Sequence, residues 1–185
     1  VKVSVPAWRA DIVHPRDLYE DAAIAYGYDN LPETELGSAT FGQPHPHELL
    51  TGNARRSLIG LGAMEVMTLT LTSEDVSFEK CGIVVGEPHV ELEHPISVEQ
   101  TMLRVSLVPG LMETLAVNLG HGYPQRIFEV GSVVFVDSAA ETGAREDRHA
   151  ALALAGDGFG YADIRSQVDA FLADWGHRVG ETLAI

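Results

Sequence analysis

The stretch that most constrains the fold is QRIFEVGSVVFVD, residues 125–137. Its β-branched and aromatic side chains predict a largely buried strand. Similar but weaker patterns predict further strands at 64–72, 83–92 and 150–156, and apolar residues at helical spacing predict helices at 46–60, 107–119 and 161–176. These elements alternate without the βαβ rhythm and glycine-rich turn of a dinucleotide-binding fold. We therefore expect an α+β domain, in which an antiparallel sheet is flanked by helices.

The N-terminal part of the chain is set off from this pattern. Residues 1–5 alternate as a strand does, and a helix is then predicted from Pro15 to just before Gly27. Residues 29–47 are rich in proline, glycine and polar side chains, which is typical of a linker. The sequence thus predicts a domain boundary in this stretch.

The composition is that of a globular chain, with 45% hydrophobic and 21% charged residues. The formal net charge is −15, and Lys2 and Lys80 are the only lysines. An acidic surface poor in lysine suits concentrated salt, so we expect a halophilic source, with an ordinary acidic protein as the alternative. Because no basic stripe is visible, non-specific binding of nucleic acid by this chain alone is not expected.

Cysteine content and the chain start bear on where the protein works. Cys81 is the single cysteine, which excludes intramolecular disulfides and cysteine-based zinc sites and fits a cytoplasmic protein. No apolar run reaches the roughly 20 residues that a membrane span needs, and the first residues contain no signal-peptide core. The chain starts with Val1 rather than methionine, so we expect a piece of a longer protein.

Four carboxylates gather near the N-terminus, and they belong to Asp11, Asp17, Glu20 and Asp21. On the predicted helix, Asp17 lies three residues before Glu20 and four before Asp21, so these side chains share a face. Like charges repel there, and a hard cation such as Mg²⁺ would turn the repulsion into binding. On spacing alone, a solvated acidic helix start is the favoured interpretation and a magnesium site is the alternative.

Several stretches, taken in order, resemble the β subunit of phenylalanyl-tRNA synthetase in its archaeal form. VPAWRADIVHPRDLYEDAAIAYGYDNLP is similar to the end of the small module that precedes that subunit's catalytic-like domain. HPISVEQTMLRVSLVPGLMETLAVNL and RIFEVGSVVF are similar to segments of the catalytic-like domain itself. The resemblance implies that residues 1–30 are the C-terminal part of a small α/β module, that 31–47 are a linker, and that 48–185 are a truncated class II synthetase catalytic-like domain.

The same resemblance changes the interpretation of the four carboxylates. In this family the small module contributes acidic residues to a magnesium site shared with the α subunit, and the matching positions are Asp11, Asp17, Glu20 and Asp21. The resemblance therefore implies that magnesium is a cofactor and that these side chains face a partner chain. It also implies an α₂β₂ enzyme, cytoplasmic and without a membrane segment, that joins phenylalanine to its tRNA with ATP and meets the tRNA as a whole enzyme.

The resemblance further implies that the catalytic groups are missing from this chain. Class II synthetases place an arginine on the ATP phosphates from a strand–loop–strand motif, and the matching stretch GSVVF puts Phe135 there. No arginine follows until Arg145, and the chain ends at Ile185 before a glycine-rich third motif. We expect a scaffold for the catalytic α subunit that is inactive alone. The alternatives are a paralogue with its own amino-acid or adenylate pocket and a stand-alone magnesium-binding module.

Other residues carry smaller expectations. The helix at 46–60 matches the first class II motif, which forms dimer interfaces, so we expect its stripe to pack on the α subunit; the alternative is an intramolecular core stripe. That stripe consists of Leu50, Ala54, Leu58 and Leu61.

Arg104 resembles a position near substrate in catalytic relatives, but an intramolecular salt bridge is favoured. Glu129 is interpreted as a structural acid that needs a partner such as Arg126 or a backbone donor. Loop positions are expected for His14, His45, His47 and His121.

Overall fold

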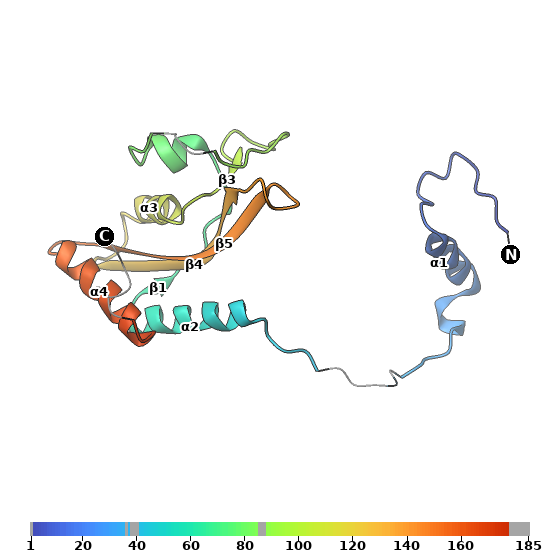
Figure 1. Ribbon diagram of the computed structural model, residues 1–185, viewed down its shortest axis with the longest axis horizontal. Coiled ribbons are helices and arrows are strands. Elements are labelled where there is room, and N and C mark those ends of the chain that lie inside the picture. The colour runs from blue at the N-terminus through green and yellow to red at the C-terminus, as the bar shows by residue number, and fades with distance from the viewer. Residues whose placement is uncertain (1, 36, 38–40, 85–87, 178–185) are drawn as a thin grey trace. The chain divides into compact units, whose positions relative to one another are not determined.

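A computed structural model describes residues 2–35, 37, 41–84 and 88–177 of the chain. The chain divides into two compact units, residues 1–43 and 44–185 (Figure 1). No helix in the described part is long and apolar enough to cross a membrane. Residues 178–185 of the predicted catalytic-like domain lie outside the described residues.

The first unit is built around helix α1, Pro15–Tyr26. The helix begins at Pro15, as predicted, and His14 is its N-cap. It ends at Tyr26, just before Gly27, whose φ of 89° favours glycine. A single 3₁₀ turn, η1 (Tyr28–Asn30), follows. Residues 2–5 form no strand, so that prediction is wrong: alternation alone does not make a strand when no neighbouring strand pairs with its backbone groups.

The second unit is organised by a three-stranded sheet of order β1-β4-β5. Strand β4 (Gln125–Val136) is central, with β5 (Ala144–Ala155) antiparallel along its whole length and β1 (Met64–Glu65) parallel at its other edge. A smaller antiparallel pair joins β2 (Leu71–Thr72) to β3 (Met102–Leu103). The main sheet is therefore mixed, which corrects the expectation of a purely antiparallel sheet.

Helices cover both faces of this sheet. Figure 1 shows the sheet between α2 (Pro46–Gly60) on one side and α3 (Val108–Val117) on the other, with α4 (Tyr161–Asp174) beside the end of α2. A short π-helical turn, η2 (Asp75–Glu79), follows β2. The three predicted helices of this unit are confirmed, with ends within a few residues of those expected.

Alternation along β4 builds the core. Phe128 and Val130 point to the α2 side, where they pack with Ala54 and Leu58 of α2 and Ala63, and with half-buried apolar side chains of β5 and α4. The intervening residues point to the α3 side. Because both faces of β4 are covered, its sequence reads as a nearly continuous apolar run, and this is why it was the strongest strand signal.

Two strand predictions need correction. The run at 64–72 does not form one strand, because β1 pairs with β4 and β2 pairs with β3 in a different sheet. The strand predicted at 150–156 starts six residues earlier than expected, at Ala144. The first half of β5 is polar and largely exposed, so a pattern of buried apolar residues could not identify it as a strand. Of the region 83–92, residues 85–87 lie outside the described residues, and the rest contributes one bridge, from Glu91 to Met102.

Candidate functional site

The acidic cluster of the first unit (Asp11, Asp17, Glu20 and Asp21) is already paired with a positively charged side chain, that of Arg9. The Arg9 guanidinium donates to Asp11 at 2.7 Å and to Asp21 at 2.8 Å, so that one arginine joins two of the four predicted magnesium ligands. Hydrogen bonding to Arg9 lowers the pKa of Asp11, and the same contacts raise the pKa of Arg9. Asp11 and Arg9 therefore stabilise each other's charged forms.

Asp17 has a different task, at the start of α1. Its Oδ2 accepts hydrogen bonds from the backbone N–H groups of Val13 at 2.9 Å and His14 at 2.7 Å, while the His14 ring caps the first turn of the helix. Those two backbone donors lower the pKa of Asp17. Glu20, the remaining member of the set, is exposed on the helix. The capping role of Asp17 and His14 was not predicted, although an acidic residue three positions after the N-cap was a signal for it.

The fit of these residues to Mg²⁺ is therefore partial. Carboxylate oxygens are the donors that the ion prefers. In this arrangement, however, Arg9 lies between Asp11 and Asp21, and Asp17 is engaged by backbone N–H groups. The carboxylates do not come together as a group of three within 4.8 Å of one another, a test made on the described residues only. A metal at this place requires Arg9 to move.

The bonds of Asp17 predict how the first unit responds to acid. Because the pKa of Asp17 is lower in the folded chain, its contribution to stability is complete above the ordinary aspartate pKa, about 4, and is lost as the pH falls through the lowered value. We expect the helical signal of α1, followed by NMR, to decrease on acidification below about pH 4. In Asp17→Ala, α1 should be frayed already at neutral pH and should change less on acidification. An identical acid response in both proteins would contradict this assignment.

The apolar stripe of α2 is divided between the core and the surface. Ala54 and Leu58 retain only 7% and 4% of their accessible surface, and half-buried Leu61 packs against the same cluster. The partner contact predicted for Ala54 and Leu58 is corrected, because their surface is already covered by β4 and its neighbours. Leu50 is 50% exposed, since the buried face of α2 passes through Thr51 instead.

A cleft of about 1210 Å³ lies in the second unit, between the β2–β3 pair, η2 and α3. Among the described residues that line the cleft, the lysine and arginine side chains are those of Lys80 and Arg104. Lys80 pairs with Asp75 at 2.8 Å. Acidic side chains predominate along the walls: Glu74, Asp75, Glu79, Glu91, Glu99 and Glu113. A lining of this charge repels the phosphates of a nucleotide.

Arg104 lines the cleft but is buried, and its guanidinium is bound to groups within the fold. Its Nη1 lies 2.8 Å from Glu129 Oε1 and 2.8 Å from Thr68 Oγ1, and its Nε donates to the Ser132 carbonyl at 2.8 Å. The Thr68 hydroxyl in turn donates to Glu129 at 2.6 Å. The favoured salt bridge of Arg104 is confirmed. Of the two partners suggested for Glu129, the backbone donor is confirmed, because the Thr68 N–H donates to Glu129 Oε2 at 3.3 Å. Arg126 is not its partner and instead stacks on the ring of Phe159 at 5.3 Å.

Two glycines leave the space that this buried network occupies. A Cβ on Gly131 would overlap the Arg104 guanidinium and lie 2.8 Å from Glu129 Oε1. A Cβ on Gly110 would lie 2.5 Å from the Thr68 hydroxyl. The network therefore needs a residue without a side chain in β4 and another in α3, where these elements approach Arg104, Glu129 and Thr68 closely.

Phe135 occupies β4 opposite Arg145 of β5. The hairpin therefore brings Arg145 next to Phe135, which stands where the resemblance places the catalytic arginine of class II synthetases. Their separation along the sequence did not suggest this pairing. The Arg145 guanidinium lies 5.8 Å from the ring centre of Phe135 and pairs with Asp147 at 2.9 Å. The hydrogen bond that Arg145 donates to Asp147 is the main cause that raises the pKa of Arg145. Its charge is already compensated by its own strand.

A further group of titratable side chains was missed by sequence reasoning. His89 lies between Glu74 and Glu91 at the edge of the cleft. The His-x-Glu spacing of HVE at 89–91 was a weak signal, and nothing in the sequence joined it to Glu74.

Comparisons with known proteins agree with the structure. The family model described as phenylalanyl tRNA synthetase beta chain CLM domain matches residues 31–181, and the one described as tRNA synthetase B5 domain matches residues 1–28. Among solved structures, a pyrrolysyl tRNA synthetase of Desulfitobacterium hafniense is similar with a TM-score of 0.56 and 21% identity, over 72% of this chain and 48% of that one. This likeness shows a class II synthetase fold.

Curated relatives point to one family. The chain is 43% identical to the phenylalanine–tRNA ligase beta subunit of Methanothrix thermoacetophila over 94% of its own length, and 41% identical to that of Pyrococcus furiosus over 95%. It spans 31% of the length of each relative. The match of a family model to most of the chain, together with these relatives, shows that the chain belongs to the phenylalanyl-tRNA synthetase β-chain family.

Proposed function

We propose that this chain is part of a phenylalanine–tRNA ligase β subunit and serves as an assembly scaffold for a catalytic α subunit. The relatives are named as beta subunits of that ligase, and the chain covers about a third of their length. In the proposed enzyme, phenylalanine activation with ATP takes place on the α subunit, and tRNA is bound by the whole assembly. The stoichiometry that we propose is α₂β₂.

The observation that carries this proposal is the internal pairing of the cleft's cations. Arg104 is bound to Glu129 and Lys80 to Asp75, while the remaining charged side chains of the described lining are predominantly acidic. Adenylate formation needs cationic groups on the nucleotide phosphates. The cleft as described supplies none in a free state, which supports a role other than catalysis.

Exposed apolar side chains support a docking role. On α2, Leu49 and Leu50 are about half exposed, and on the first unit Trp8, Val13 and Tyr19 are largely exposed. Helix α1 itself has no buried residue. A unit with so little core of its own gains stability when a partner covers these surfaces. We therefore place the proposed α-subunit contact on the Leu50 side of α2 and on the first unit.

We propose that magnesium belongs to the assembled enzyme rather than to this chain alone. Asp11, Glu20 and Asp21 supply carboxylates of the right chemistry, and Asp17 caps the helix that carries Glu20 and Asp21. An ion between Asp11 and Asp21 would displace Arg9 from them. A partner that supplies further oxygens, or an acceptor for Arg9, would favour that exchange.

A capture experiment tests the scaffold proposal. The full 185-residue chain serves as bait in source-organism lysate at near-saturating salt, and captured proteins are identified by mass. We expect the ligase α subunit, with capture weakened at least about tenfold by Leu50→Asp, since a charge would be buried in an apolar contact. Asp17→Ala with Asp21→Ala should weaken capture as well, whereas the exposed acid variant Asp157→Ala should not.

Three other results would contradict all or part of this proposal. Absence of the α subunit from the captured proteins would overturn the scaffold proposal. ATP–pyrophosphate exchange by the chain alone would favour a paralogue with its own pocket. Capture that is equally strong with the aspartate variants would contradict the proposed interface metal but would still support the scaffold.

We also propose a cytoplasmic, salt-rich setting for the protein. The formal net charge of −15 and the two lysines among 185 residues are those of a surface that stays hydrated in concentrated salt. Melting temperatures that rise steadily up to molar potassium chloride would support this setting.

A further inference from the structure

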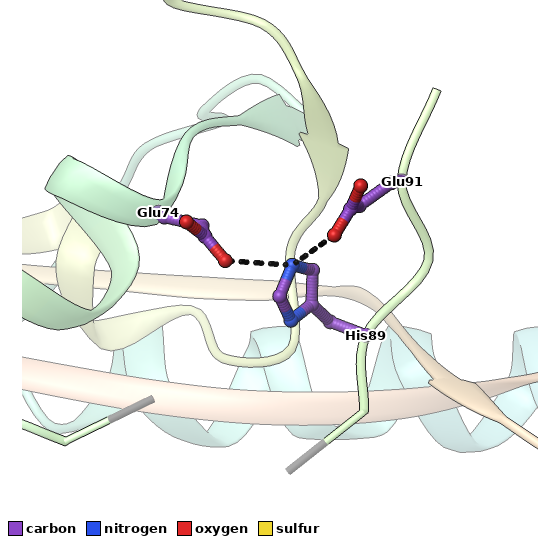
Figure 2. Close-up of side chains that lie close together, drawn as sticks. All are labelled: Glu74, His89 and Glu91. Carbon is purple, nitrogen blue, oxygen red and sulfur yellow. Dashed lines mark ion pairs between the residues drawn. The ribbon is translucent and has the colours of Figure 1, made fainter. Parts of the chain in front are cut away.

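We propose that Glu74, His89 and Glu91 form a binding site for a divalent transition-metal ion of the zinc class. The three side chains come together at the edge of the cleft in the second unit (Figure 2). The site is separate from the acidic cluster of the first unit and does not depend on the proposed function.

The position of the His89 ring is the first observation. The side chain is 6% exposed and its ring packs on Phe78, with ring centres 5.5 Å apart. Neither ring nitrogen makes a hydrogen bond with any residue that the structure describes. A buried imidazole without hydrogen bonds is costly, and binding of a metal through a nitrogen removes that cost.

The geometry around Nε2 is the second observation. Figure 2 shows the two carboxylates approaching this same nitrogen, with Oε1 of Glu74 at 3.3 Å and Oε1 of Glu91 at 3.4 Å. These distances exceed those of ordinary N–H···O hydrogen bonds, and one N–H cannot be donated fully to two oxygens. Two ligand atoms about 2.0–2.1 Å from one tetrahedral zinc ion lie about 3.3–3.4 Å apart. The observed separations therefore fit ligands of a common ion.

The backbone holds these residues in place. Glu91 forms a bridge with Met102, and its neighbours are fixed by hydrogen bonds from Leu103 N to Val90 O at 2.9 Å and from Leu92 N to Thr101 O at 2.8 Å. Glu74 is the N-cap of η2, two residues after β2, and Ser77 N donates to Ser73 O at 2.9 Å in the same turn. The three candidate ligand atoms lie within 4.8 Å of one another, so small rotations of the exposed carboxylates complete the site.

The donor set selects the kind of ion. One imidazole nitrogen with two carboxylate oxygens suits Zn²⁺ and its first-row neighbours, whereas Mg²⁺ and Ca²⁺ prefer oxygen ligands throughout. Three protein ligands leave a fourth position for water, and the exposed carboxylates place that position toward the cleft. The ion would tie η2 to the 89–91 segment and neutralise part of the acidic lining.

Zinc titration of the full 185-residue chain tests this site. The chain, free of any polyhistidine tag and stripped with a chelator, is titrated with zinc chloride against a chromophoric chelator. We expect one tight zinc ion per chain. Loss of an outer-shell partner alone costs about 10–100-fold in metal affinity, so loss of a direct ligand in His89→Gln or Glu91→Gln should cost at least about 100-fold.

Two controls make the result specific. His47→Gln alters a histidine of the His45–His47 pair, whose ring centres are 5.1 Å apart, and should leave the tight site unchanged. Cobalt in place of zinc should give the intense visible absorption of four-coordinate Co²⁺, and this should vanish in Glu91→Gln, an exposed position whose variant keeps the fold. The absence of stoichiometric zinc, or zinc affinity that is the same in His89→Gln and Glu91→Gln as in the unaltered chain, would overturn the proposal.

Discussion

Arg104→Met is expected to destabilise the folded chain by about 3–5 kcal/mol, because it leaves a buried carboxylate without its cation. The side chains of Arg104 and Glu129 are 7% and 3% exposed, and their charged atoms lie 2.8 Å apart. Methionine fills much of the same volume but donates nothing to Glu129, Thr68 or the Ser132 carbonyl. The lost stabilisation is therefore mainly that of an unpaired buried charge rather than of a cavity.

Urea unfolding followed by circular dichroism measures this effect, and a second substitution identifies its cause. Arg104→Met combined with Glu129→Leu removes both charges and should recover much of the lost stability, since apolar replacement of a whole buried pair is often neutral. Arg145→Met removes an exposed arginine paired with Asp147 and should have a much smaller effect. An Arg104→Met loss no larger than that of Arg145→Met would contradict the buried network.

The network also gives Arg104 a structural role in the second unit. Arg104 lies in the segment after β3, Glu129 lies in β4, and Thr68 lies between β1 and β2. The pair with its shared hydroxyl thus joins the two sheets of the second unit. Gly131 and Gly110 leave room for it, so Gly131→Ala should disturb the same contacts.

The elements that sequence reasoning placed well are those with local signals. Helix α1 carried a proline at its start and a glycine after its end, and β4 carried a continuous apolar run. These signals act within one turn or one strand, so no distant contact is needed to interpret them. The family resemblance rested on the same stretches and agrees with the family models that match the chain.

Features that depend on distant contacts were not predictable. The 64–72 run was divided because its two ends pair with strands about 60 and 30 residues away. Arg9 could not be assigned to Asp21, nor Glu74 to His89, before the chain was folded. The stripe on α2 was in the right place, but only packing against Phe128 decided that Ala54 and Leu58 belong to the core.

Phe128 is the residue on which that core depends most. Its side chain is fully buried in a cluster with Ala54 and Leu58 of α2, and half-buried Phe171 and Trp175 at the end of α4 pack against that cluster. Phe128→Ala should lower the free energy of unfolding by about 3–5 kcal/mol, because α2 and the sheet cannot close fully over the missing ring. Loss of this contact should also loosen the helix that presents Leu50 to the proposed partner.

Phe135→Ala provides the matched comparison, since it removes the same side chain from the same strand at a half-buried position. We expect it to cost less than half as much as Phe128→Ala, because its ring meets Arg145 and His149 near the surface rather than the core. Equal losses in urea unfolding would mean that the α2 face does not hold the second unit together. If only Phe128→Ala weakens capture of the α subunit, the core beneath α2 is what positions the proposed interface.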